Sequence, residues 1–252
     1  EHVAGSEETF AQLMNQYAAR LGMKNTHYVN ASGLHDPNHF TTARDIAILS
    51  RALIRDFPSD YATYAQKQFT LNGITQHNRN TLLWRDPSVD GIKTGHHKEA
   101  GYCLAASAKR GDTRLISVVM DSSSEKLRAN QSQTLLNYGF GFFETHTLYA
   151  VGATVAEPKL WRGAADKARL GVASPALITI PRGGYARLQA AMNIQKPLSA
   201  PLRKSQDVGR LVVKLDGEEL LNTPLVALQD YPEGGFFSRL SDTVWLWFDD
   251  GE

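Results

Sequence analysis

The hydrophobic pattern of the chain changes near residue 146, and this change constrains the fold more than any other feature. Before it, long segments carry apolar residues at helical spacing, and two apolar runs flank a short polar turn. After it, short apolar segments are separated by Gly, Pro and Asp-Gly turns, a pattern typical of β-strands. The sequence therefore predicts an α+β domain over residues 1–145, with helices on an antiparallel sheet, and a small all-β sandwich over 146–236.

Three helices and one hairpin make up the predicted first domain. Ser6 and Gly22 suit the start and the stop of a helix, which we predict over 6–22. Apolar spacing and a following Pro predict a second helix over 42–56, and a third is predicted over about 124–143. "GYCLAASAK" and "TRLISVVM" read as the two strands of a hairpin. The "RGD" between them looks like an adhesion motif, but its composition is that of a tight turn.

The composition excludes several classes of protein. Of the 252 residues, 42% are hydrophobic and 21% are charged, as in an ordinary globular protein. The net charge of +1 gives no support for nucleic-acid binding, which needs a basic patch. No run approaches the roughly 18 apolar residues of a membrane-spanning helix. Cys103 is the one cysteine, so no internal disulfide is expected, and its apolar strand suits an inert core residue.

A Lys-Thr-Gly triplet at residues 93–95 lies just before the hairpin, in "VDGIKTGHH". Opposite a nucleophilic serine, the ammonium of the lysine can stabilise negative charge and assist proton transfer. The hydroxyl can donate a hydrogen bond to a substrate carboxylate, and the glycine lets a substrate backbone approach without a clash. The triplet alone would fit a solvated polar turn, so the surrounding sequence has to decide between the two interpretations.

The surrounding sequence closely resembles the low-molecular-mass penicillin-binding proteins, which are D-alanyl-D-alanine carboxypeptidases of the bacterial periplasm. In the first domain the resemblance rests on "EHVAGSEE", "LGMKNTHYVNASGL", "TTARDIAILSRALIRDFP", "NRNTLLW", "VDGIKTGHH", "AGYCLAASAKRGDTRLISVVM" and "YGFGFFET". In the second it rests on "ITIPRGG", "APLRKSQDVGRLVVKLDGEEL" and "PLVALQDYPEGGFF". It implies a serine acyl-transfer fold followed by a β-sandwich domain and, over 237–252, the start of a C-terminal amphipathic membrane anchor.

The resemblance also assigns roles to the triplet. The family has three active-site motifs, Ser-x-x-Lys, Ser-x-Asn and Lys-Thr-Gly, of which only the third is found here. The first two are expected upstream of Glu1, so that 1–145 would be the C-terminal portion of the catalytic domain. Lys93 would support proton transfer, Thr94 would bind the substrate carboxylate, and Gly95 would keep the strand open.

Four further residues are assigned by the same resemblance. His96 would line the edge of the site, and Arg128 would help to hold the terminal carboxylate, a task that suits a planar guanidinium. Asp56 and Arg79 match positions that can pair beneath the cleft in related enzymes. A surface pair of little energetic consequence is an equally good interpretation of these two residues.

The implied activity is removal of the terminal D-alanine from peptidoglycan pentapeptides through an acyl-enzyme that β-lactams trap. Its partners would be a stem peptide ending in D-Ala-D-Ala, β-lactam antibiotics and a membrane surface, but no nucleic acid. No cofactor or metal is expected, and the location would be the periplasmic face of the inner membrane. The alternatives are a D,D-endopeptidase or serine β-lactamase of the same superfamily, and a non-catalytic peptidoglycan-binding or scaffold protein.

Two other patterns in the sequence do not indicate a site. "SSEK" at 123–126 is a literal Ser-x-x-Lys, but it follows the triplet, whereas the family nucleophile precedes it. His35 and His39 could join His96 or His97 as metal ligands, yet Pro37 prevents a helical alignment and no cysteine or carboxylate pattern completes a zinc site. We interpret these histidines as part of a solvated loop. The aromatic tail "FFSRLSDTVWLWF" fits a membrane-surface segment and a helix docked on the β domain equally well.

Overall fold

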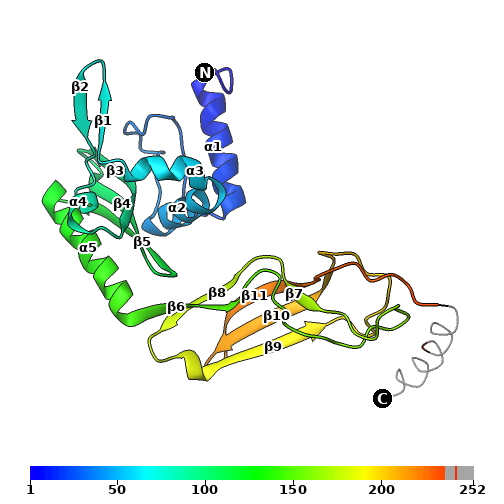
Figure 1. Ribbon diagram of the computed structural model, residues 1–252. Coiled ribbons are helices and arrows are strands. Elements are labelled where there is room, and N and C mark those ends of the chain that lie inside the picture. Colours follow the sequence, from blue (N-terminus) through cyan, green and yellow to red (C-terminus); the bar gives the residue numbers. More distant parts are fainter. Residues whose placement is uncertain (236–241, 243–252) are drawn as a thin grey trace. The chain divides into compact units, whose positions relative to one another are not determined.

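The computed structural model describes residues 1–235 and Asp242, and the predicted anchor over 237–252 otherwise lies outside these residues (Figure 1). The chain divides into two compact units between Phe142 and Phe143, close to the predicted boundary. Within the described residues, no helix is both long and apolar enough to cross a bilayer.

Helices α1 (Glu7–Leu21) and α2 (Ala43–Asp56) of the first unit begin at side-chain caps. The Ser6 hydroxyl accepts the backbone N–H of Thr9, and the Thr42 hydroxyl accepts that of Asp45. Helix α1 ends at Gly22, which has a φ of 81° and donates its N–H back into the last turn. Local sequence therefore determines where these helices start and where α1 stops.

A three-stranded antiparallel sheet forms the centre of the first unit, in the order β3-β4-β5 (Figure 1). Strands β4 (Gly101–Arg110) and β5 (Thr113–Ser122) are the predicted hairpin, and the "RGD" segment forms its turn. Strand β3 (Val89–His97) carries the triplet and pairs with β4 alone, so it is an edge of this sheet. The predicted helix-on-sheet architecture is confirmed.

Helices cover both faces of the sheet. Successive strand residues point to opposite faces, so Leu104 and Ala106 face one side while Ala105 faces the other. Helix α5 (Glu125–Phe142) packs on the first face through Leu136 and Phe140. Helix α2 packs on the second face, beside Tyr61. The hairpin strands are apolar on both faces because both faces are buried.

Short elements lie between α2 and β3. They are α3 (Pro58–Tyr61), the 3₁₀ turn η1 (Ala62–Ala65), the strands β1 (Gln68–Leu71) and β2 (Ile74–His77), and α4 (Leu82–Arg85). The β1–β2 hairpin was not predicted, although "LNGI" contains the Asn-Gly signal of a two-residue turn. Asn72 and Gly73 have φ values of 50° and 76°, as a type I′ turn requires.

The second unit is a two-sheet β structure, as predicted. Strands β6 (Phe143–Tyr149) and β8 (Ala176–Pro181) pair with each other. The second sheet has the order β7-β11-β10-β9, formed by β7 (Leu170–Val172), β9 (Leu188–Ile194) after the short turn η2 (Tyr185–Arg187), β10 (Asp207–Leu215) and β11 (Glu218–Ala227). Ile178 and Ile180 of β8 share a core with Leu211, Val213 and Leu225 of the larger sheet. The two sheets therefore pack face to face.

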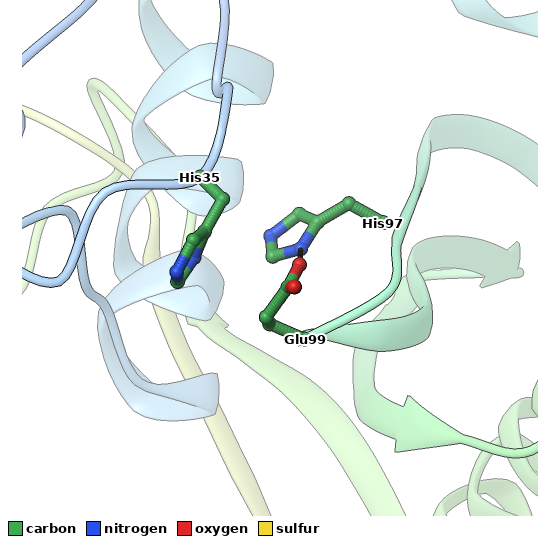
Figure 2. A group of neighbouring side chains, drawn as sticks. All are labelled: His35, His97 and Glu99. Carbon is green, nitrogen blue, oxygen red and sulfur yellow. Dashed lines mark hydrogen bonds and ion pairs between the residues drawn. The ribbon is translucent and has the colours of Figure 1, made fainter.

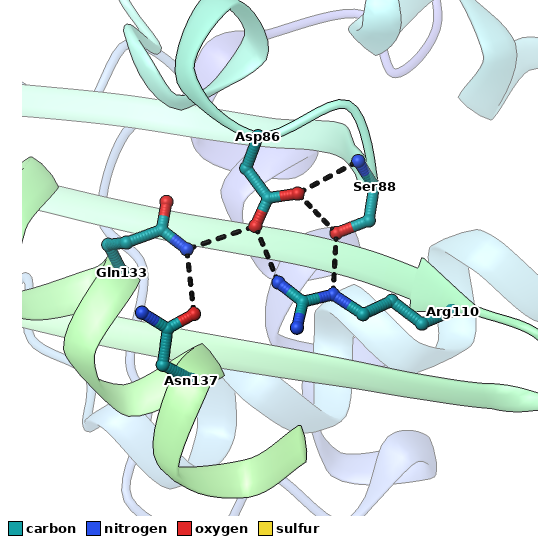
Figure 3. Close-up of polar contacts among 5 residues, drawn as sticks. All are labelled: Asp86, Ser88, Arg110, Gln133 and Asn137. Carbon is teal, nitrogen blue, oxygen red and sulfur yellow. Dashed lines mark hydrogen bonds and ion pairs between the residues drawn. The ribbon is translucent and has the colours of Figure 1, made fainter. Parts of the chain in front are cut away.

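A buried carboxylate joins three parts of the first unit (Figure 3). Asp86, which is 8% exposed, accepts hydrogen bonds from the backbone and side chain of Ser88, from Arg110 Nη2 at 2.8 Å and from Gln133 Nε2 at 2.9 Å. Burial by itself would raise the pKa of this carboxyl. The hydrogen bonds from Ser88, Gln133 and Arg110 outweigh burial and hold the Asp86 pKa well below its usual range.

Replacing Asp86 by Asn should lower the free energy of unfolding by about 2–4 kcal/mol at pH 7, because Arg110 loses its buried counter-charge and an NH2 donor replaces one of the two acceptor oxygens. A depressed pKa contributes stability that is fully present above the unfolded-state value of about 4 and is lost as pH falls below it. Urea unfolding at pH 7 and at progressively lower pH would measure both effects. The difference in unfolding free energy between wild type and Asp86→Asn should become smaller in acid. Asp112→Asn, at an exposed position, is the matched control. A gap that stays constant with pH would contradict this assignment.

Candidate active site

The triplet lies in the second half of the edge strand β3. Lys93, Thr94 and Gly95 pair with Ala105, Leu104 and Cys103 of β4 in regular antiparallel register. The opposite side of β3 has no strand partner within the described residues. An extended ligand could therefore add to this edge through backbone hydrogen bonds, as peptides do in β-augmentation.

The side chains of the triplet leave polar groups at the surface. Lys93 is exposed, and its Nζ donates a hydrogen bond to the Thr94 carbonyl oxygen at 2.5 Å. Thr94 is half-buried, and its hydroxyl has no hydrogen-bond partner among the described residues. Adjacent residues of this edge strand therefore offer a cation and an unpaired hydroxyl, both of which are groups that can bind an anion.

Arg128 ties helix α5 to the triplet. It is 2% exposed, and its Nη1 donates to the Gly95 carbonyl oxygen at 3.2 Å. Nη2 lies 3.5 Å from a carboxylate oxygen of the exposed Glu125. A guanidinium has five N–H donors, and these two contacts are the hydrogen bonds that Arg128 makes within the described part of the chain. The guanidinium therefore has N–H donors that no described group accepts.

His96 and Arg128 approach the same aromatic ring. The His96 ring stacks on Tyr102 with centroids 3.9 Å apart and planes at 26°. The guanidinium of Arg128 lies 5.5 Å from the centroid of that ring. Tyr102 is the β4 partner of His96, so cross-strand pairing positions the imidazole at the rim of the triplet.

A second group of residues, which sequence reasoning missed, anchors the first half of β3. The Tyr61 hydroxyl donates to Asp90 Oδ1 at 2.7 Å, and Arg114 forms an ion pair with the same carboxylate at 2.7 Å. Burial raises the pKa of the Tyr61 phenol, and the neighbouring Asp90 carboxylate adds to the rise, so the phenol remains a donor. These contacts join α3 and β5 to the strand that carries the triplet.

Asn80 adds a further anchor at Gly91. Its amide nitrogen donates to the Gly91 carbonyl oxygen at 2.9 Å, and the side chain is 1% exposed. A Cβ at Gly91 would lie only 2.7 Å from the Tyr61 hydroxyl, so a glycine is needed there. Asn80 lies in "NRNTLLW" and Gly91 in "VDGIKTG", two segments that carry the family resemblance. Nothing local in either segment shows that the two residues touch.

Asp56 and Arg79 are not brought together. Asp56 binds its neighbour Arg55 through two hydrogen bonds of 2.6 and 2.7 Å, and all three side chains are exposed. No ion pair joins Asp56 to Arg79 within the described residues. An adjacent guanidinium reaches the carboxylate in a two-point geometry, which explains the choice of partner. Of the two interpretations of these residues, the structure does not show the pair beneath the cleft, and it places Asp56 in a surface contact with Arg55 at the end of α2.

The Ser-x-x-Lys at 123–126 lies at the start of α5. Ser123 and Lys126 are exposed, whereas the Ser124 hydroxyl accepts the backbone N–H of Leu127. That contact is a helix cap, which is a structural use for this serine-rich segment.

Both units of the chain match known protein families. The D-alanyl-D-alanine carboxypeptidase family model covers residues 1–124, and the model of the penicillin-binding protein 5 C-terminal domain covers 143–233. The chain is 45% identical over 250 residues to the D-alanyl-D-alanine carboxypeptidase DacC of Escherichia coli, which is 98% of this chain and 62% of that protein. The chain thus spans less than two thirds of the length of this relative.

Solved structures are similar as well. The crystal structure of penicillin binding protein 5 from Haemophilus influenzae has a TM-score of 0.79 and 41% identity, covering 92% of this chain and 69% of that one. Penicillin-binding protein D2 from Listeria monocytogenes, solved in a cefotaxime-bound form, has a TM-score of 0.50 and 34% identity, covering 53% of this chain and 60% of that one. The sequence and the structure together therefore show that the chain belongs to the D-alanyl-D-alanine carboxypeptidase family of penicillin-binding proteins.

Proposed function

We propose that the protein is a serine-type D-Ala-D-Ala carboxypeptidase, in which these residues supply one wall of the cleft. The observation that carries the proposal is the edge strand β3, on which Lys93, Thr94 and the Arg128-bound Gly95 lie together. Similarity to named carboxypeptidases over 98% of the chain supports it. The substrate would be a peptidoglycan stem peptide ending in D-Ala-D-Ala.

The proposed reaction proceeds through an acyl-enzyme. A serine, which the family resemblance assigns to a Ser-x-x-Lys motif upstream of Glu1, attacks the carbonyl carbon of the penultimate D-alanine. The peptide C–N bond breaks, the terminal D-alanine leaves as an amine after gaining a proton, and water then hydrolyses the ester. β-Lactams would acylate the same serine through opening of their ring, and the cefotaxime-bound relative supports this extension.

The chain contributes charge and shape to this reaction. The Lys93 ammonium would stabilise negative charge near the serine and assist proton transfer. The Thr94 hydroxyl and the Arg128 guanidinium would hold the terminal carboxylate of the substrate, and His96 would line the edge. The substrate would lie along β3 as an added strand, with Gly95 leaving room for its backbone.

The proposal places the protein at the periplasmic face of the bacterial inner membrane. A peptidoglycan substrate requires access to the periplasm, and the amphipathic sequence over 237–252 is the proposed membrane contact. Asp242 is the only described residue in that segment.

Release of D-alanine from a D-Ala-D-Ala-terminated pentapeptide by the full-length protein, which includes the segment expected to carry the serine, tests the proposed function when measured by mass spectrometry. Loss of one D-alanine per peptide supports the proposal. Cleavage of a cross-linked muropeptide in preference to the pentapeptide would instead favour the endopeptidase alternative, and rapid turnover of penicillin would favour a β-lactamase. Peptidoglycan binding without turnover and without labelling by fluorescent penicillin would favour the non-catalytic alternative.

Replacing Gly95 by Ala separates folding from substrate access. A Cβ at Gly95 would meet nothing closer than the Cys103 Cβ at 3.9 Å, so the folded chain does not require a glycine there. Stability should be unchanged or higher by up to about 1 kcal/mol, because Ala restricts the unfolded chain. Acylation by fluorescent penicillin should slow by about 10- to 100-fold, because the methyl group displaces the ligand from β3.

The control for this variant is Gly141→Ala, at a helical glycine of α5 where an added methyl group would have no neighbouring atom within 4 Å. It should leave acylation unchanged. Equal acylation rates for Gly95→Ala and Gly141→Ala would contradict the placement of the ligand on β3.

A further inference from the structure

Three side chains with metal-binding atoms meet at the end of β3. They are His35, His97 and Glu99, and each has a ligand atom within 4.8 Å of a ligand atom of both others (Figure 2). The His35 and His97 ring centroids are 5.7 Å apart. Sequence reasoning considered the histidines but overlooked Glu99, which lies two residues after His97, and His35 joins this pair only in the folded chain.

The loop that carries His35 is held at both ends. His27 and Phe40 form a β-bridge across its base, with backbone hydrogen bonds of 2.9 and 3.0 Å. Beyond His35, Asp36 accepts the backbone N–H of Asn38 at 2.7 Å and closes a turn. These hydrogen bonds therefore hold the loop that carries His35 in place.

His97 and Glu99 are presented by the tight turn between β3 and β4. His97 is the last residue of β3 and pairs with Gly101. Its Nδ1 lies 3.2 Å from Glu99 Oε2 and accepts the Ala100 N–H at 3.2 Å. These contacts orient the ring from one side, and Figure 2 shows the other ring nitrogen on the side of His35.

The chemistry of the three ligands favours one class of metal ion. Two imidazoles and one carboxylate are a recognised ligand set for Zn²⁺ and leave a fourth position open. Ca²⁺ and Mg²⁺ prefer sites made of oxygen, so a pair of imidazoles disfavours them. The side chains of His97 and Glu99 are 37% and 48% exposed, so an ion can reach them from solvent.

We propose that His35, His97 and Glu99 bind a divalent transition-metal ion, Zn²⁺ foremost, at the rim of the candidate active site. The ion would join the His27–Phe40 loop to the end of β3, two residues beyond Gly95. It is a structural tether at the edge of the cleft and has no part in the acyl transfer described above. The inference stands on the cluster itself and does not need the proposed function.

Isothermal titration of the intact, tag-free protein with ZnCl₂ tests the site. Wild type should bind one Zn²⁺ saturably at this site, with no comparable binding of Ca²⁺ or Mg²⁺. His35→Ala, His97→Ala and Glu99→Gln should each weaken binding at least about 10-fold, because loss of even an outer partner of a ligand has that effect. His77→Ala removes an exposed histidine of β2 outside the cluster and should leave the affinity unchanged.

Two further variants test whether a change in zinc affinity comes from the loss of a ligand. His35→Cys retains a zinc ligand and should preserve binding that His35→Ala loses, which separates coordination from damage to the fold. Lys93→Ala should bind Zn²⁺ like wild type whether or not the protein is a carboxypeptidase. Absence of saturable binding in wild type, or equal affinity in wild type, His35→Ala and His97→Ala, would overturn the proposal.

Discussion

Replacing Lys93 by Ala should reduce the second-order rate of acylation by fluorescent penicillin by about 100- to 10,000-fold, the range typical of a group that assists proton transfer. Lys93 is exposed, and its one hydrogen bond goes to the adjacent Thr94 carbonyl, so removal of the side chain leaves no buried group unpaired. The fold should therefore survive the change. Rates from a time course of labelling, read on a denaturing gel, measure the effect.

The matched control for Lys93 is Lys126→Ala. Lys126 is an exposed lysine of the same unit and belongs to the alternative Ser-x-x-Lys at 123–126. It should label at the wild-type rate. If Lys126→Ala abolished labelling and Lys93→Ala did not, the triplet would lose its assigned role and the segment at 123–126 would gain it.

Replacing Arg128 by Ala should lower kcat/KM for a D-Ala-D-Ala peptide by about 10- to 100-fold, mainly through KM. A hydrogen bond from a charged donor contributes about 1.5–3 kcal/mol, which corresponds to this range. The side chain is buried against Gly95, so the variant also loses the link between α5 and β3. Steady-state kinetics, with thermal unfolding as a check on folding, measure the two consequences separately.

A substrate without a carboxylate separates recognition by Arg128 from its structural role. Wild type should turn over a C-terminally amidated peptide poorly, and Arg128→Ala should lower that residual rate little further. Arg128→Lys keeps the charge but loses the planar fork, so it should recover only part of the affinity. An equal loss on the acid and the amide would mean that Arg128 acts solely by holding β3 in place.

Much of the fold follows from local patterns in the sequence. Ser6, Thr42 and Gly22 mark helix ends because caps satisfy backbone groups within a few residues. The central hairpin and the change near residue 146 follow from strand periodicity and turn composition. The β1–β2 hairpin was predictable on the same grounds from Asn72-Gly73 and was missed.

The triplet itself was recognisable from the sequence, because its three residues are contiguous and the flanking segments resemble one family. The resemblance also pointed to Arg128, but the contacts that hold the triplet in place were not recognisable. Arg128 meets Gly95 across 33 residues, and Tyr61 meets Asp90 across 29. Such contacts depend on how helices and strands pack, and no local pattern records which distant partner a side chain will reach.

Local patterns were thus enough to predict the main helices and the central hairpin, the order of the two domains and the motif on β3. Packing of the folded chain brings Arg128 to Gly95, and it brings His35 to His97 and Glu99. The physical reason is the range of the interactions. Caps, turns and strand alternation act over a few residues, whereas ion pairs and ligand clusters form between segments that only chain packing brings within a few ångströms of each other.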